Sequence, residues 1–170
     1  MKRAVPEKEK LEGIEKKLVE LLKEKKMKVS SAESLTGGLV SKLITDVSGA
    51  SAVFECGVCS YSNRIKNEVL GVNSRILEEF TEYSEECAAG MADGIRRLSG
   101  ADIGISTTGI AGPSGGSKEK PVGTVYVGIS TKNDTKAYEF RLGEYGSREK
   151  IRNIAAVCAL FLGYEALLEP

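Results

Sequence analysis

The stretch Ser31-Ala32-Glu33-Ser34-Leu35-Thr36-Gly37-Gly38 stands between two different sequence patterns. Residues 28–30 before it favour a β-strand, and the apolar spacing over 39–44 after it is that of a helix. The stretch therefore predicts a strand, a tight turn and a helix N-terminus, where unpaired N–H groups attract negative charge. One interpretation is an ordinary loop in which Ser34 or Thr36 caps the helix. The other is a turn that exposes a hydroxyl group for chemistry.

The composition indicates a soluble globular chain with no strong electrostatic bias. Its 170 residues suffice for one domain with a real core, and 41% are apolar and 28% charged. Lys plus Arg and Asp plus Glu each number 24, and this balance argues against broad binding to nucleic acid. We expect no membrane association, because no apolar run looks long enough to cross a bilayer. The N-terminus lacks the apolar core of a signal peptide, so the predicted location is the cytoplasm.

Histidine is missing from the chain, and this narrows the chemistry more than any motif does. Ser-His-Asp and Cys-His triads, histidine bases and histidine-bound metals are all excluded. Of the four cysteines, Cys56 and Cys59 have redox or zinc spacing, but no second pair accompanies them. We interpret all four as reduced, mostly buried thiols and expect no metal. A hydrolytic nucleophile here must be activated by Lys, Tyr, Asp or Glu.

The order of elements predicts a single α/β domain with three α/β/α layers and a mixed, mostly parallel sheet. A charged extension over 1–9 precedes this domain over 10–170. Strands are predicted over 28–32, 53–61, 101–107, 122–131 and 136–142, with a hairpin turn at Asn133-Asp134. Helices are predicted over 7–26, 36–47, 64–70, 73–80, 85–98 and 148–168. The amphipathic helices at the two ends of the chain are compatible with a homo-oligomer.

Three loops follow predicted interior strands, over 34–38, 61–66 and 108–116. In open α/β sheets, ligands bind at the carboxyl ends of the strands. If the strands are parallel neighbours, these loops meet at one edge of the sheet and form a single site.

Lys66 is the candidate base in the second loop, where it follows Tyr61 and lies early in a short helix. The dipole of that helix disfavours a positive charge there. A neutral lysine near pH 7 requires its pKa to fall by roughly three units from the ordinary value of about 10.4. This corresponds to about 4 kcal/mol, which burial and a cationic neighbour can produce. The alternative is a surface lysine that pairs with Glu68 or Glu55.

The third loop, 108–116, is rich in glycine but matches neither a P-loop nor a dinucleotide fingerprint. It allows a phosphate or a planar ring to approach the backbone closely, and its alternative is a flexible surface loop. Arg148 and Arg152 lie one turn apart in the last helix. One helix face could present both to an anion, or both could be solvated.

Three segments together resemble one family. They are Ala32-Glu33-Ser34-Leu35-Thr36-Gly37-Gly38, the Tyr61-Ser62-Asn63…Lys66 stretch, and Thr108-Gly109-Ile110-Ala111-Gly112-Pro113-Ser114-Gly115-Gly116 followed by Lys120-Pro121-Val122-Gly123-Thr124. This pattern resembles the C-terminal domain of CinA, which also stands alone as the PncC-like nicotinamide-nucleotide amidases. The resemblance covers about residues 10–167. It implies hydrolysis of nicotinamide mononucleotide to nicotinate mononucleotide and ammonia, without metal or organic cofactor.

The resemblance also implies roles for individual residues. Ser34 resembles the nucleophile, Tyr61 and Lys66 its activating partners, and Thr108 a hydroxyl that assists at the reacting group. Backbone amides near Thr36, Gly37 and Gly38 are the expected oxyanion donors. The expected ribose-phosphate contacts are Gly109, Gly112, Ser114 and Arg148.

A non-catalytic interpretation remains beside the amidase. The chain could be a nucleotide- or partner-binding module of the competence- and damage-inducible type. Longer CinA proteins carry a further N-terminal domain, and activities of that domain are not expected here. Ammonia release from the nucleotide separates the two interpretations.

Overall fold

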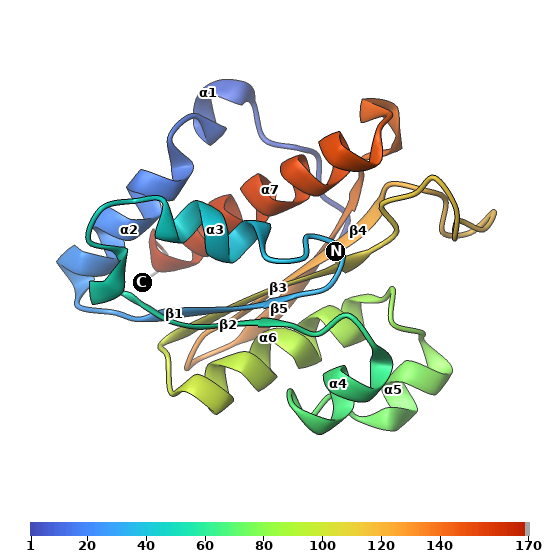
Figure 1. The fold of residues 1–170 in the computed structure, drawn as a ribbon, viewed down its shortest axis with the longest axis horizontal. Helices are drawn as coiled ribbons and strands as arrows, with labels where there is room; N and C mark the ends of the chain where they lie inside the picture. Colours follow the sequence, from blue (N-terminus) through green and yellow to red (C-terminus); the bar gives the residue numbers. More distant parts are fainter. Residues whose placement is uncertain (169–170) are drawn as a thin grey trace.

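A computed structural model describes residues 1–168 as a five-stranded sheet with helices on both faces (Figure 1). The strand order is β2-β1-β3-β4-β5. The strands are β1 (Val29–Glu33), β2 (Phe54–Cys59), β3 (Ile103–Gly109), β4 (Thr124–Ser130) and β5 (Thr135–Arg141). This arrangement confirms the predicted three-layer α/β/α fold.

The helices divide between the two faces of the sheet (Figure 1). One face carries α1 (Lys8–Leu11), α2 (Ile14–Lys25), α3 (Leu39–Thr45) and α7 (Arg148–Leu168). The other face carries α4 (Asn63–Glu68), α5 (Ser74–Glu79) and α6 (Glu85–Ser99). Two short 3₁₀ turns, η1 (Ala50–Ala52) and η2 (Gly143–Tyr145), complete the described elements.

The sheet is mixed in the predicted way. β1 pairs in parallel with both β2 and β3, while β4 is antiparallel to its neighbours β3 and β5. Only β4 therefore runs against the other strands. The hairpin forms at the expected turn, where the Thr131 N–H donates to the Asp134 carbonyl at 2.8 Å.

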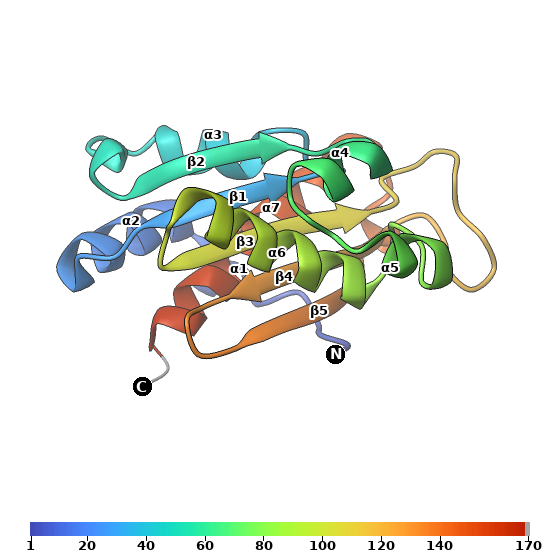
Figure 2. The same ribbon diagram turned by 90° about the horizontal axis from the view of Figure 1, so that it is seen from below.

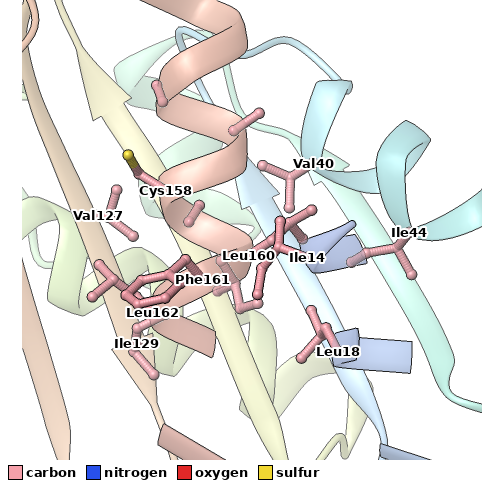
Figure 3. Close-up of a cluster of buried hydrophobic side chains, with 14 of the residues drawn as sticks. Ile14, Leu18, Val40, Ile44, Val127, Ile129, Cys158, Leu160, Phe161 and Leu162 are labelled. Carbon is pink, nitrogen blue, oxygen red and sulfur yellow. The ribbon is translucent and has the colours of Figure 1, made fainter. Parts of the chain in front are cut away.

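The main core lies between the sheet and α2, α3 and α7 (Figure 3). Its labelled members are Ile14, Leu18, Val40, Ile44, Val127, Ile129, Cys158, Leu160, Phe161 and Leu162. Helix α7 is long and apolar enough to cross a membrane, so the expectation that no such segment exists was wrong. Its contacts with α2, β3 and β4 are those of a core helix in a soluble fold.

The N-terminal region departs from prediction in one respect. The single helix expected over 7–26 is two helices, because Gly13 has a left-handed backbone with φ of 66° between α1 and α2. Ahead of α1, Lys2 forms an isolated parallel bridge with Glu139 of β5. The first residues of the chain thus lie along the edge strand.

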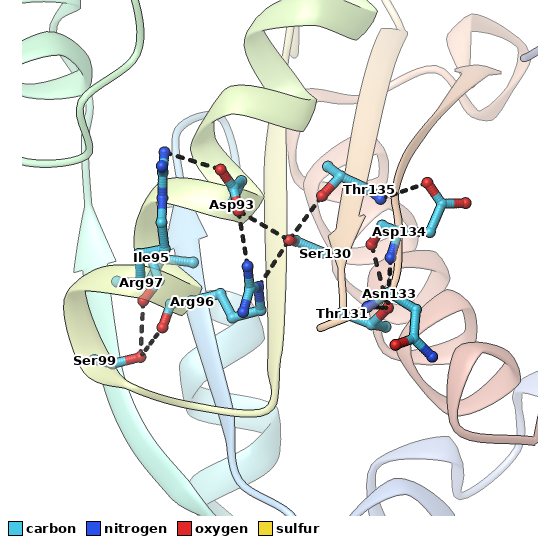
Figure 4. Close-up of polar contacts among 10 residues, drawn as sticks. All are labelled: Asp93, Ile95, Arg96, Arg97, Ser99, Ser130, Thr131, Asn133, Asp134 and Thr135. Carbon is cyan, nitrogen blue, oxygen red and sulfur yellow. Dashed lines mark hydrogen bonds and ion pairs between the residues drawn. The ribbon is translucent and has the colours of Figure 1, made fainter.

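A polar network attaches α6 to the β4–β5 hairpin (Figure 4). Arg96 donates from Nε to Ser130 Oγ at 3.0 Å and from Nη2 to the Asp93 carboxylate at 3.0 Å. Ser130 Oγ also shares a hydrogen bond of 2.8 Å with Thr135 Oγ1. This network fixes the helix against the strands on the face opposite the main core.

The N-terminus of α3 is capped by Glu33, the last residue of β1. Its carboxylate is completely buried and accepts hydrogen bonds from the N–H groups of Gly38, Val40 and Ser41 at 2.9–3.0 Å. The hydroxyls of Thr36 and Ser41 each donate to it at 2.7 Å. The prediction that Thr36 or Ser34 caps this helix was therefore wrong, since Gly38 occupies the cap position and the acceptor comes from the strand.

Replacement of Glu33 should destabilise the fold strongly. Glu33→Ala leaves buried N–H groups of α3 without an acceptor, and we expect the free energy of unfolding to fall by about 3 kcal/mol. Glu20→Ala, at an exposed position of α2, should change it by less than about 0.5 kcal/mol. Urea unfolding of both variants measures the difference. Equal stability of the two would show that the cap contributes nothing.

Candidate active site

The three predicted loops meet beyond the carboxyl ends of β1, β2 and β3. Figure 2 shows α4, α5 and the glycine-rich loop after β3 gathered at this end of the sheet. A cavity of about 130 Å³ lies between them. Its walls are Ser34, Leu35, Tyr61, Asn63, Lys66, Glu82, Tyr83, Gly109, Ile110, Ala111, Gly112, Ser114, Gly115 and Arg148. The predicted convergence is thus observed.

Ser34 and Lys66 are in direct contact inside this cavity. Lys66 Nζ donates to Ser34 Oγ at 3.1 Å and to the Ser60 carbonyl at 2.9 Å. Ser62 caps α4 by accepting from the Ile65 N–H, which orients the helix that carries the lysine. The exposed fraction is 1% for Lys66 and 6% for Ser34. A buried amine therefore touches a hydroxyl that opens on the cavity.

Burial is the main influence on the charge of Lys66. It lowers the pKa of the amine, while the neighbouring Cys87 and Glu82 act in the opposite direction. Of the causes expected from the sequence, burial is the one that lowers this pKa, and within residues 1–168 no cationic neighbour is among its causes. The alternative of a surface ion pair is excluded, because Glu68 pairs with Arg64 and Glu55 with Lys28.

Tyr61 and Arg148 form the outer rim of the cavity. Tyr61 is 64% exposed, and its hydroxyl accepts a hydrogen bond of 3.1 Å from Arg148 Nη2. Arg148 Nη1 also donates to the Gly112 carbonyl at 2.8 Å. The structure thus joins Tyr61 to Arg148 and the glycine-rich loop, and it shows no hydrogen bond between Tyr61 and Lys66 within residues 1–168.

The turn after Ser34 is organised differently from the expectation. Thr36 is completely buried; its hydroxyl donates to Glu33 and contacts Thr107 Oγ1 at 2.6 Å. The N–H groups of Gly37 and Gly38 donate to Ser34 O and Glu33, so neither is free to bind an oxyanion. Thr36, Gly37 and Gly38 are absent from the cavity walls. Both glycines have positive φ, which this tight turn requires.

Other donors remain in this turn. Within residues 1–168 the N–H groups of Leu35 and Thr36 form no hydrogen bond, and Leu35 lines the cavity. The carbonyl of Leu35 accepts from Arg152 Nε and that of Thr36 from Arg152 Nη2, both at 2.9 Å. Arg152 therefore fixes the turn, and it is not among the residues that line the cavity. One interpretation of the sequence, in which Arg148 and Arg152 bind an anion together, is not supported by this arrangement.

Thr108 is close to the cavity but does not line it. Its hydroxyl donates to the Glu82 carbonyl at 2.6 Å, and its side chain is completely buried. Gly109, Gly112 and Ser114 of the same loop do form walls, as predicted. The loop thus lines the cavity with Gly109, Gly112 and Ser114, and through the buried Thr108 it holds the segment that carries Glu82.

Comparison with known proteins identifies the family. The sequence pattern of the CinA C-terminal domain matches residues 11–167. This chain belongs to the CinA family. A putative competence-damage inducible protein of Thermoanaerobacter pseudethanolicus is 50% identical over 149 residues, which are 88% of this chain and 36% of that protein. A CinA-like protein of Kosmotoga olearia is 48% identical over 157 residues, 92% of this chain and 38% of that protein. The chain thus spans little more than a third of these curated relatives.

Solved structures of the CinA superfamily share the fold. The competence/damage inducible protein CihA of Agrobacterium tumefaciens superposes with a TM-score of 0.89 at 35% identity, covering 94% of this chain and 96% of that one. A CinA superfamily protein of Klebsiella pneumoniae gives a TM-score of 0.87 at 29% identity, covering 94% and 98%. The α/β architecture described above is therefore that of the family.

Three polar residues that line this cavity were not predicted from the sequence: Asn63, Glu82 and Tyr83. Asn63 follows the cap of α4, while Glu82 and Tyr83 precede α6 in a loop without a motif. Burial raises the pKa of the Tyr83 phenol, and the adjacent Glu82 carboxylate raises it further. Asn63 lies within the loop over 61–66, so its place at the cavity could have been predicted. Glu82 lies in no recognisable motif, and the sequence around it gives no sign that it lines the cavity.

No cysteine is among the residues that line this cavity, although Cys87 lies close enough to Lys66 to act on its pKa. All four cysteines are free thiols; Cys87 and Cys158 are buried and Cys59 is exposed. Burial raises the pKa of Cys87 to about 11. Among residues 1–168, no cluster of three potential metal ligands occurs.

A larger cavity, about 410 Å³, lies at the opposite end of the sheet between residues such as Met27, Ile129 and Leu162. The smaller cavity is the one that contains the hydrogen bond between Lys66 Nζ and Ser34 Oγ. We therefore place the candidate chemistry in the smaller one.

The buried lysine should make stability depend on pH. Because the pKa of Lys66 is lower in the folded chain than the value of about 10.4 expected when unfolded, the unfolded chain binds more protons between the two values. The free energy of unfolding of the wild type should therefore rise relative to Lys66→Met as the pH increases from the lowered pKa of Lys66 toward about pH 10. Urea unfolding across this range measures the trend.

A matched control separates this effect from general titration. Lys16→Met removes an exposed lysine of α2 and should follow the pH profile of the wild type. Parallel profiles for the wild type and Lys66→Met would contradict the lowered pKa of Lys66.

Proposed function

We propose that this CinA-family domain hydrolyses the carboxamide of nicotinamide mononucleotide to nicotinate mononucleotide and ammonia. The observation that carries the proposal is the 3.1 Å contact between the Ser34 hydroxyl and the buried Lys66 amine in a chain without histidine. A neutral lysine can take the proton that an attacking serine must lose. The substrate is a small nucleotide, the site requires no cofactor, and the location is the cytoplasm.

The mechanism is acyl transfer through Ser34. Its oxygen attacks the amide carbon while Lys66 takes the hydroxyl proton, and the C–N bond breaks as Lys66 returns that proton to the departing ammonia. Water then attacks the carbonyl carbon of the serine ester while Lys66 takes a proton from it. The bond to Ser34 Oγ breaks as Lys66 returns that proton to the serine oxygen, and the acid product leaves as its carboxylate after losing its proton to solvent. The unpaired N–H groups of Leu35 and Thr36 are the proposed oxyanion donors, in place of the glycine amides.

The ribose-phosphate is proposed to lie toward the rim. Arg148 supplies a permanent positive charge beside Gly112 and Tyr61. The backbone of Gly109, Gly112 and Ser114 allows the nucleotide to approach closely. In this proposal Tyr61 helps Arg148 to bind the nucleotide, and it does not share the proton transfer with Lys66.

Removal of the nucleophile or base should abolish ammonia release. Ser34→Ala and Lys66→Met should each lower kcat by at least about 10³-fold, and the double variant should be no worse than either because the pair acts as a unit. Ser74→Ala and Lys16→Met, at exposed positions, serve as controls. Ammonia is measured with nicotinamide mononucleotide as substrate. A folded wild type that releases none contradicts the amidase and favours a binding module, and full activity of Ser34→Ala contradicts the nucleophile.

Arg148→Met should weaken recognition of the phosphate. We expect KM for nicotinamide mononucleotide to rise about tenfold with a smaller change in kcat, because a charge-assisted contact is lost away from the reacting bond. Nicotinamide riboside, which lacks the phosphate, should be affected little. Arg75→Met in α5 is the matched control. An equal loss for both substrates would assign Arg148 to loop structure alone.

A further inference from the structure

The segment 80–83, between α5 and α6, forms one wall of the cavity and is held rigidly. The Glu82 carbonyl accepts from Thr108 Oγ1 at 2.6 Å. Lys120 Nζ donates to the carbonyls of Phe80 and Tyr83 at 3.0 and 2.6 Å. Thr81 has a left-handed backbone with φ of 70°, an uncommon conformation for this residue type. Such bracing by two distant residues indicates that the position of this segment matters.

Glu82 and Tyr83 are the residues of this segment that line the cavity, and Glu82 brings a carboxylate to it. The side chain is partly buried, and Asn63 Nδ2 approaches one of its oxygens at 3.5 Å. Within residues 1–168 Glu82 forms no ion pair with a lysine or arginine. The fixed cation of the cavity, Arg148, belongs to α7 and contacts the rim. The cavity thus has charged groups of opposite sign on two walls: the Arg148 guanidinium from one layer, and from the other the Glu82 carboxylate, which also acts electrostatically on Lys66.

We propose that Glu82 is a specificity-determining residue that favours a positively charged aromatic carboxamide over the carboxylate product. This inference rests on the proposed function. The pyridinium ring of nicotinamide mononucleotide carries a positive charge, and hydrolysis adds a negative charge to the same ring. The reacting end of the nucleotide therefore changes from cationic to neutral, and a nearby carboxylate binds the first form better than the second.

This cavity, with opposite charges on two walls, fits a zwitterionic nucleotide as a whole. Arg148 faces the phosphate end and Glu82 the pyridinium end, so each charge of the substrate meets an opposite charge. Thr108 and Lys120 are then positioning residues, since they hold the backbone of Glu82 and act on the substrate only through it. This assigns to Thr108 an indirect role in place of the direct one expected from the sequence.

Calorimetry with both nucleotides tests the role of Glu82. Binding is measured in a Ser34→Ala background, so that no turnover occurs. Glu82→Gln should weaken binding of nicotinamide mononucleotide about tenfold, which is about 1.4 kcal/mol. Binding of nicotinate mononucleotide should stay the same or become tighter. Glu79→Gln, an exposed neighbour in α5 with the same change of charge, should alter neither.

The ratio of the two affinities decides the outcome. A merely structural role of Glu82 would weaken both nucleotides together and leave the ratio unchanged, and that result overturns the proposal. So does an equal change of the ratio in Glu79→Gln. Glu82→Ala must shift the two nucleotide affinities in the same direction as Glu82→Gln. This control shows that the effect comes from loss of the carboxylate and not from the new glutamine amide. Ammonia release by the wild type tests hydrolysis separately, so the two proposals can fail independently.

Discussion

The buried carboxylate of Glu33 is the constraint on which the site depends. It is the last residue of β1, and by accepting the N–H groups of Gly38, Val40 and Ser41 it ties the start of α3 to the end of the strand. Successive side chains of a strand point to opposite faces. Because Glu33 points toward α3, Ser34 points toward the other layer, where α4 carries Lys66. One carboxylate thus fixes both the turn and the direction of the adjacent hydroxyl.

The second constraint is the burial of Lys66. A lysine without a carboxylate partner is costly to bury in its charged form, so the neutral form gains population. That is the form able to accept a proton from Ser34. In a chain without histidine, desolvation thus lowers the pKa of one lysine. The Ser62 cap orients α4, and the hydrogen bond from Nζ to the Ser60 carbonyl holds the amine in place.

Much of this architecture could be predicted from local sequence rules. Ser62, Asn73 and Ser84 each cap the helix expected after them, because their side chains reach N–H groups only two or three residues away. The convergence of the three loops followed from strand direction alone. The cap of α3 could not be predicted, since Glu33 acts from a preceding strand and rules for caps consider only the turn. The position of Glu82 at the cavity could not be predicted for a similar reason, because it depends on tertiary contacts of its segment with Thr108 and Lys120.

Helix α7 connects these features to the core. Its buried residues anchor it between the sheet and α2, so its first turns are rigid. From there Arg152 donates to the carbonyls of Leu35 and Thr36 and so fixes the turn after Ser34. Within residues 1–168 the N–H groups of the same two residues form no hydrogen bond. One turn earlier, Arg148 holds Gly112 and Tyr61. Because both arginines come from one core helix, a change in the packing of α7 would move the turn at Leu35 and Thr36 and the glycine-rich loop at Gly112 together. The geometry of the site is therefore set by the hydrophobic core as much as by the loops themselves.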